Sequence, residues 1–265
     1  MQLVDTHCHL NYESFHADLD QVIDRARSHG ISQILIPGTD LISSRVAFNI
    51  ASRSNGLYAA VGVHPNDALS WQDQTIESIQ EMASQDEVCA VGEIGLDYYR
   101  DHAPRPLQLQ ILKVQLDLAS VVQKPVVLHS RSSLEDLLYV LAEWVEHLRA
   151  TNNPLAANPG VLHSFEGNLK QARHAVALGF KIGISGPVTY KNAREKHDLA
   201  QGLDMSAILL ETDAPFLSPH PYRGQRNEPA FIPLIAQKIA DLRSISVEKV
   251  AQTTTSNAFE LFSWS

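Results

Sequence analysis

The feature that most constrains this fold is a repeated alternation along the chain of short apolar runs and longer amphipathic segments. The short runs have the length and composition of buried strands. The segments between them carry apolar residues at positions i, i+3 and i+4, which is the spacing of helices, and one more such segment closes the chain. The runs predicted as strands are residues 3–9, 31–37, 57–64, 88–93, 125–129, 160–163, 180–184 and 207–211.

Repeated strand–helix units predict a parallel sheet, because parallel neighbours are joined by a crossover that is usually a helix. Eight such units in 265 residues fit a closed (β/α)8 barrel, or TIM barrel, better than an open doubly wound sheet. The open sheet would carry a glycine-rich phosphate turn after its first strand, and the sequence contains neither G-x-G-x-x-G nor a Walker A motif. We therefore predict an α/β protein in which residues 1–265 form a single barrel domain.

Charge and cysteine content limit the kinds of partner that the protein can bind and the cell compartments in which we expect it. The formal net charge is −9, and the sequence contains no run of Lys or Arg. This argues against an extended basic surface that binds duplex nucleic acid, but it is compatible with a local phosphate-binding site. Cys8 and Cys89 are too few for a disulfide framework, and the first residues lack the basic and apolar regions of a signal peptide. No apolar stretch approaches the roughly 18 residues that cross a membrane. We expect a cytoplasmic protein without membrane contact or an obligate protein partner.

Histidines and carboxylates stand where predicted strands end. In a (β/α)8 barrel the carboxyl ends of all strands meet at one rim, where active sites lie. His7 and His9 are two residues apart in an extended run, so their side chains emerge on the same face and could bind one metal ion together. An isolated H-x-H pair is more often structural, so this prediction depends on partners at the rim. The candidate rim residues are His9, His64, Glu93, His129, His163 and Asp213.

Glu93 is the candidate for a carboxylate shared by two ions. It ends an apolar run that would bury it, and a buried carboxylate needs a cation or a hydrogen-bonded partner. Its two oxygens are enough to bridge two ions. His129 and His163 end two further buried strands and would complete the shell of a second ion. Each could be a core histidine by itself, but together they favour a metal site.

Asp213 and His64 are the candidates for catalytic roles. Asp213 could bind a metal and also take a proton from water, with a turn or cap aspartate before Pro215 as the alternative. Glu211 competes for this role, although two residues earlier it is expected to pack or pair below the rim. His64 could contact a substrate phosphate or shuttle a proton, and its alternative is a structural histidine before proline.

Three arginines are candidates for substrate binding. Arg131 follows His129 by two residues and could donate two hydrogen bonds to a phosphate or carboxylate. The alternative is an ordinary surface arginine without a binding role. Arg223 and Arg226 belong to residues 214–229, a proline-rich segment predicted to be a long irregular loop above the site. They could hold substrate, or Arg226 could pair with Glu228. The remaining histidines, such as His102, receive no role.

Six sequence elements together resemble the TatD family of metal-dependent hydrolases, in family order and across nearly the whole chain. The resemblance implies a TIM-barrel hydrolase with a two-metal site that acts as a deoxyribonuclease and removes nucleotides from the 3′ end of DNA. It places the ligands at His7, His9, Glu93, His129, His163 and Asp213, with Glu93 as the bridge. The elements are Asp5-Thr6-His7-Cys8-His9, Gly62-Val63-His64-Pro65, Gly92-Glu93-Ile94-Gly95-Leu96-Asp97-Tyr98, His129-Ser130-Arg131, His163-Ser164-Phe165 and Glu211-Thr212-Asp213-Ala214-Pro215.

One residue departs from the family pattern, since many relatives have cysteine where this chain has Ser164. The departure removes none of the implied ligands. Related amidohydrolases that cleave cyclic amides commonly bridge their metals with a modified lysine on the fourth strand. Glu93 occupies the end of the predicted fourth strand here and argues against that subgroup.

The leading hypothesis is metal-assisted hydrolysis of a phosphodiester at a DNA strand end, single strands more than duplexes, with Asp213 as the base. Two divalent cations are the expected cofactors; the resemblance implies Mg²⁺, whereas an imidazole-rich shell also suits Mn²⁺ or Zn²⁺. An exonuclease holds only a strand end, which is compatible with the acidic charge of the chain. Two alternatives remain open: ester or amide hydrolysis, such as D-aminoacyl-tRNA deacylation, and a non-catalytic binding protein.

Overall fold

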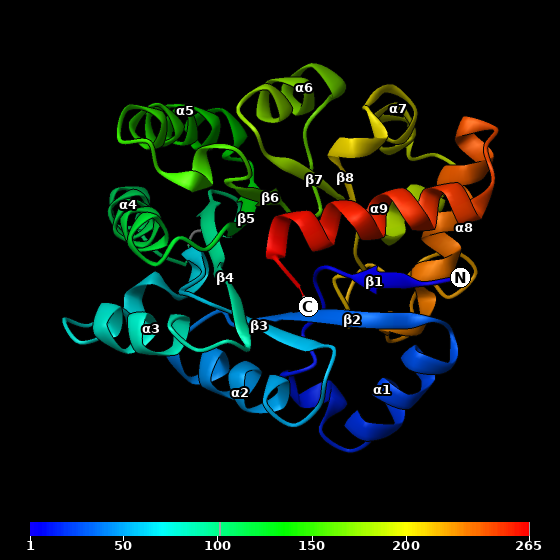
Figure 1. The fold of residues 1–265 in the computed structure, drawn as a ribbon, viewed down its shortest axis with the longest axis horizontal. Helices are drawn as coiled ribbons and strands as arrows, with labels where there is room; N and C mark the ends of the chain where they lie inside the picture. The colour runs from blue at the N-terminus through cyan, green and yellow to red at the C-terminus, as the bar shows by residue number, and fades with distance from the viewer. Residues whose placement is uncertain (101, 265) are drawn as a thin grey trace.

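The structure is a computed structural model that describes residues 1–100 and 102–264 (Figure 1). Its centre is an eight-stranded sheet in which each strand pairs in parallel with the next strand along the chain. The strands are β1 (Leu3–Asp5), β2 (Ile31–Pro37), β3 (Leu57–Val61), β4 (Val88–Asp97), β5 (Val126–Arg131), β6 (Gly160–Leu162), β7 (Lys181–Ile184) and β8 (Ile208–Leu210).

Helices follow the strands and surround the sheet (Figure 1). They are α1 (Leu19–Ser28), α2 (Leu41–Ala51), α3 (Thr75–Ala83), α4 (Arg105–Val122), α5 (Leu134–Ala150), α6 (Leu169–Ala177), α7 (Arg194–Gly202), α8 (Ile232–Arg243) and α9 (Val247–Phe262). Short 3₁₀ helices occupy Glu13–Phe15, Pro65–Ser70, Pro154–Ala156, Gly186–Thr189, Met205–Ala207 and Pro229–Phe231. Among the described residues, no helix combines the length and the apolar character that a membrane span requires.

The last strand meets the first, so the sheet closes into a barrel. The Thr6 N–H donates to the Leu210 carbonyl at 3.0 Å, and the Asp213 N–H donates to the His7 carbonyl at 2.8 Å. Further along, Cys8 and Ala214 form a parallel bridge. These contacts confirm the predicted (β/α)8 barrel.

The barrel is filled by a cluster of small and branched apolar side chains and sealed at its amino-terminal end. α9 lies across that end (Figure 1), and Trp264, which follows α9, packs in the same apolar cluster. Trp264 is 6% exposed and donates its indole N–H to Cys89 Sγ at 3.3 Å. The strand residues in this cluster are Val4, Leu35, Ala60, Cys89, Ala90, Val127, Val161 and Leu209. The opposite rim is therefore the open end.

The predicted strand ends differ from the observed ones by more than two residues at β1, β3 and β4. β1 ends at Asp5, so His7 and His9 follow the strand instead of belonging to it. The reason is that alternate N–H groups there bond to different strands: Thr6 donates to Leu210, whereas Cys8 donates to Leu35. β3 ends at Val61, before His64, whereas β4 continues past Glu93 to Asp97 and pairs there with Arg131.

The predicted long loop is observed. After β8, residues 211–228 are all described and contain neither a helix nor a strand, apart from the bridge at Ala214. The loop crosses the rim and returns to the barrel wall at Pro229–Phe231.

Candidate metal centre

A cleft of about 550 Å³ opens at the carboxyl ends of the strands. This is the rim at which the sequence analysis placed the candidate site. The cleft is lined by residues of β4 and β5 and by residues that follow β1, β2, β3, β4, β6 and β8. It contains the side chains of His9, His64, Glu93, His129, His163 and Asp213, and the fully buried His7 lies against them.

Glu93 lies at the centre of this cluster and is 3% exposed. Its Oε2 atom lies 3.4 Å from His7 Nε2 and 3.6 Å from His9 Nε2. Its Oε1 atom lies 2.8 Å from His163 Nε2 and 3.1 Å from His129 Nδ1. Each carboxylate oxygen therefore faces a different pair of imidazole nitrogens, and Oε1 also lies 3.6 Å from His64 Nε2.

The local backbone explains how β4 brings Glu93 into this position. The pairing of β4 with β5 shifts register between Val91 and Ile94, and the Glu93 N–H donates to the Gly38 carbonyl at 2.8 Å. Regular pairing then resumes at Ile94, and at Gly95 a Cβ atom would lie 2.0 Å from the His129 carbonyl oxygen. Only glycine permits this close approach of β4 to the backbone that carries His129.

Asp213 approaches the cluster from the other side. Its Oδ1 atom lies 3.5 Å from His9 Nε2 and 3.7 Å from His7 Nε2. The residue has a positive φ of 56°, which is uncommon for a residue other than glycine, and its N–H bond to His7 fixes the turn. Unusual backbone conformations of this kind concentrate at functional sites.

The donor set fits divalent cations. The Nε2 atoms of His7 and His9 lie 3.2 Å apart, and both face the oxygens of Glu93 and Asp213. Burial lowers the pKa of His7 to about 4, so its imidazole is neutral at neutral pH and keeps a lone pair. Four electron-rich atoms then converge on one space, and imidazole nitrogens with carboxylate oxygens are ligands of divalent metals.

The second group of donors surrounds the other oxygen of Glu93. His129 Nδ1 and His163 Nε2 lie 3.3 Å apart beside it. Burial would raise the pKa of Glu93, but the surrounding histidines His163, His64 and His7 hold it well below its ordinary value. Glu93 is therefore ionised at neutral pH and can accept at both oxygens. Burial likewise opposes the charge of His163, yet Glu93 raises its pKa to about 10, so without a metal His163 carries a proton that a cation bound at Nε2 would replace.

Asp97 orients His129, and the sequence analysis gave it no role. It is 1% exposed and accepts from His129 Nε2 at 3.3 Å, which leaves Nδ1 to face Glu93. Its other oxygen accepts the backbone N–H groups of Tyr99 and Arg100. Burial would raise the pKa of Asp97, but these hydrogen bonds hold it far below the ordinary value. A carboxylate behind a ligating histidine is a common feature of metal sites.

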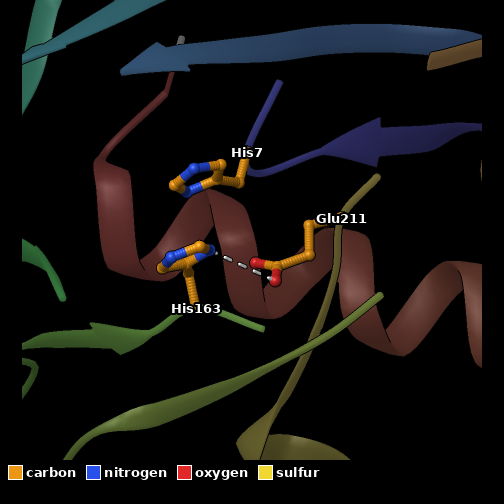
Figure 2. Close-up of side chains that lie close together, drawn as sticks. All are labelled: His7, His163 and Glu211. Atoms are coloured by element: carbon orange, nitrogen blue, oxygen red, sulfur yellow. Dashed lines mark ion pairs between the residues drawn. The ribbon is translucent and has the colours of Figure 1, made fainter. Parts of the chain in front are cut away.

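Glu211 lies behind His163, below the rim as expected. Figure 2 shows the parallel rings of His7 and His163, whose centroids are 3.9 Å apart, with the Glu211 carboxylate beside them. Its Oε1 atom lies 3.8 Å from His163 Nδ1 and accepts the Ser164 N–H. Glu211 is fully buried, and burial raises its pKa to about 8.

In His64 a backbone hydrogen bond fixes which ring nitrogen carries the proton. Its Nδ1 atom accepts the Asn66 N–H at 3.1 Å. Burial lowers its pKa to about 3, so the ring is neutral and its single proton lies on Nε2, 3.6 Å from Glu93 Oε1. His64 therefore presents a hydrogen-bond donor to the cleft.

The three candidate arginines occupy different places. Arg131 lines the cleft, with its guanidinium 4.1 Å above the ring of Tyr99. Arg223 and Arg226 are absent from the described cleft lining; Arg223 stacks 4.2 Å over Tyr190.

Arg226 does not form the expected pair with Glu228. It donates to both carboxylate oxygens of Asp18, at 2.8 Å and 2.7 Å, while Glu228 accepts from Arg25 at 2.7 Å. Two bridges thus connect the loop to α1 and the residue before it.

Several cleft residues come from loops, where periodicity predicts no position. They are Tyr12, Arg100, His102 and Phe216, and Asn66 comes from the 3₁₀ helix Pro65–Ser70. Among them, only Arg100 and His102 had a sequence feature that could have indicated the site: they follow Asp97, which lies at the end of β4.

Comparison with known proteins agrees with this geometry. The family model described as "TatD related DNase" matches residues 4–263. The chain is 36% identical over 260 residues to the uncharacterized metal-dependent hydrolase YabD of Bacillus subtilis, covering 98% of each chain. It is 35% identical over 266 residues to a protein of Erwinia amylovora named 3'-5' ssDNA/RNA exonuclease TatD, covering 98% of this chain and 99% of the other.

A solved structure shows the same fold. The crystal structure of YjjV, a TatD homolog from Escherichia coli K12, superposes with a TM-score of 0.90 at 33% identity and covers 98% of both chains. The family match and the full-length relatives confirm the resemblance found in the sequence. The chain belongs to the TatD family of metal-dependent hydrolases.

Proposed function

We propose that this protein is a metal-dependent exonuclease that removes nucleotides from the 3′ end of single-stranded DNA. The observation that carries the proposal is Glu93, whose two oxygens face two separate pairs of imidazoles in an open cleft. The relative from Erwinia amylovora, named as an ssDNA/RNA exonuclease, supports the substrate class.

Two divalent cations are the proposed cofactors. His7, His9, Asp213 and Glu93 Oε2 would hold one, and Glu93 Oε1, His129 and His163 would hold the other. When bound, such ions polarise the phosphate and lower the pKa of an attacking water. We propose Mg²⁺ as the activating ion, with Mn²⁺ or Zn²⁺ as alternatives that the imidazole-rich set also suits.

The side chains of the cleft would supply proton transfer and orientation. The pKa of Asp213 lies below its ordinary value, because its hydrogen bond to His9 and the nearby histidines outweigh its burial. It is therefore ionised at neutral pH and can accept the proton of the attacking water at a carboxylate oxygen. His64 can donate its Nε2 proton to a phosphate oxygen, and Arg131 can pair with a phosphate.

The size of the cleft favours a strand end over a duplex. Its volume of about 550 Å³ falls in the range of small-ligand pockets, roughly 300–1,000 Å³. A net charge of −9 also argues against a long contact with a polyanion, whereas a local site with cations and Arg131 needs to hold one end only.

The test is hydrolysis of 5′-labelled single-stranded DNA by metal-stripped protein, with Mg²⁺, Mn²⁺ or Zn²⁺ restored separately. We expect a ladder of products shortened from the 3′ end, and no shortening by a His129→Ala, Asp213→Ala double variant. If no ion supports shortening although two ions bind per chain, the exonuclease proposal is wrong. Hydrolysis of aminoacyl-tRNA by the same samples would then assign the site to an ester substrate.

A further inference from the structure

The cleft has two chemically different sides. Arg100 and Arg131 line it next to β4 and β5, whereas Tyr12 and Phe216 line it next to β1 and β8. β4 and β8 are four strands apart in the eight-stranded barrel, so the two arginines (the basic side) and the two aromatic rings (the aromatic side) face each other across the histidine cluster. Asp97 also lines the basic side, but its carboxylate is bonded to His129 and to two backbone N–H groups. A nucleotide has the matching division, because it joins an anionic phosphate to an aromatic base.

Phe216 is the exposed member of the aromatic side. Its side chain is 51% exposed, three residues after Asp213. Tyr12 stacks on His9 at 4.5 Å, and Phe216 meets Tyr12 with ring centroids 5.9 Å apart at 78°. The ring of Tyr12 is therefore in contact with His9 and Phe216, whereas about half of the Phe216 side chain is exposed and accessible to a ligand.

The backbone under Phe216 is fixed in place. Its N–H donates to the Asp213 carbonyl at 2.9 Å. The side chain of Asn227, which is 0% exposed, donates to the Phe216 carbonyl at 2.6 Å and to the Thr212 carbonyl at 2.9 Å. A buried amide therefore holds the segment that carries both Asp213 and the exposed ring, and a pre-organised contact costs less entropy on binding.

We propose that Phe216 stacks on the base of the terminal nucleotide and makes the enzyme prefer an unpaired strand end. This inference rests on the proposed exonuclease function and deepens it. A base at a duplex end is already paired and stacked, whereas an unpaired base offers its face to an aromatic side chain. The basic side of the cleft then lies where the phosphate would be.

The test compares the affinities of thymidine 5′-monophosphate and inorganic phosphate for the Mg²⁺-loaded protein, measured by calorimetry. Phe216→Leu keeps apolar volume but removes the flat ring, and Phe216→Tyr keeps the ring. We expect wild type and Phe216→Tyr to prefer the nucleotide, and Phe216→Leu to lose about 10-fold or more of that preference. Phosphate affinity and circular dichroism report whether each variant is folded.

Two results would overturn the inference: a wild type without preference for the nucleotide, or a Phe216→Leu variant that keeps the full preference. Strand shortening tests the exonuclease proposal separately. If wild type shortens no DNA but Phe216→Leu loses the nucleotide preference, the exonuclease proposal fails and the base contact stands. If wild type shortens DNA and Phe216→Leu keeps the preference, Phe216 is an ordinary exposed surface residue.

Discussion

The two ends of the barrel share the same eight strands but have opposite chemistry. At the amino-terminal end, Trp264 stacks on Tyr58 and Phe262 with ring centroids 5.3 Å and 5.0 Å away. At the carboxyl end, Glu93 is as buried as a core residue, yet it is surrounded by imidazoles and faces a cleft of about 550 Å³. One end is closed by apolar contact, and the other keeps ionisable groups together.

The difference lies in how the strands end. Around the sealed end, apolar side chains from all strands but β7 meet in one cluster. At the rim, β1 stops at Asp5 and β4 shifts register before Ile94, so the backbone leaves the regular ladder where side chains must turn inward. Irregular pairing of this kind re-aims side chains next to active sites. Substitutions at the two ends should therefore separate activity from stability.

Glu93→Gln should have the largest effect. It keeps the shape of the side chain but removes the negative charge shared by both groups of histidines, so ion content should fall and activity with it. We expect a loss in kcat on the order of 10³-fold or more, which corresponds to about 4 kcal/mol of transition-state stabilisation. Metal analysis and DNA shortening would measure both. Glu166→Gln removes the same charge from the cleft lining, away from the cluster, and should retain both ions. A Glu93→Gln protein with two ions and normal activity would contradict the site.

Trp264→Ala changes the amino-terminal end of the barrel and should lower stability instead of activity. Removing a buried indole leaves a cavity and should cost about 3 kcal/mol of unfolding free energy. Activity well below the melting temperature should stay near wild type, because no cleft residue contacts the indole in the described chain. Urea unfolding with a parallel activity assay would measure both properties. Trp264→Phe keeps the stacking and should recover most of the stability; a stable but inactive Trp264→Ala protein would disprove the separation.

Asp97→Asn should weaken one metal position more than the other. The amide keeps an acceptor for His129 but loses the charge that orients it, and such changes behind a ligand typically cost about 10- to 100-fold in metal affinity. Titration with Mn²⁺ should resolve one weakened and one unchanged ion. Asp67→Asn is the matched control, because Asp67 also lines the cleft but makes no described bond to His129. Equal weakening of both ions would mean that Asp97 acts on the whole cleft instead.

Strand order and the positions of the rim histidines could be predicted because the spacing of apolar residues reports burial. Once eight strands alternate with helices, their carboxyl ends must meet, and this brings His129, His163 and Glu93 within hydrogen-bonding distance of one another. The role of Asp97 was missed because β4 was expected to end at Glu93. Ile94 and Leu96 continue the apolar alternation and were the available signal, but the register shift that carries the strand past Glu93 has no counterpart in that pattern.

Loop contacts could not be predicted, because they join residues that are distant in sequence. Arg226 was expected above the site or beside Glu228, two residues away. It instead binds Asp18, which precedes α1, and no local pattern encodes a contact across that separation. Phe216 lies in the same loop, and its backbone carbonyl is held by the buried amide of Asn227, 11 residues away.

Arg226→Ala should have the smallest effect and should loosen the rim without damaging the sealed end. The pKa of Asp18 is lowered to about 2, chiefly by its hydrogen bond to Arg226. A lowered folded-state pKa stabilises the protein above the unfolded value of 3.8, and this stabilisation disappears as the pH falls toward 2. Because the pair is partly exposed, its loss should cost less than about 1 kcal/mol of unfolding free energy. NMR titration should show the pKa of Asp18 moving up toward 3.8 in the variant, while Arg223→Ala should leave it unchanged. If the pKa of Asp18 does not change in the variant, Arg25 alone is sufficient to lower it, and this prediction is wrong.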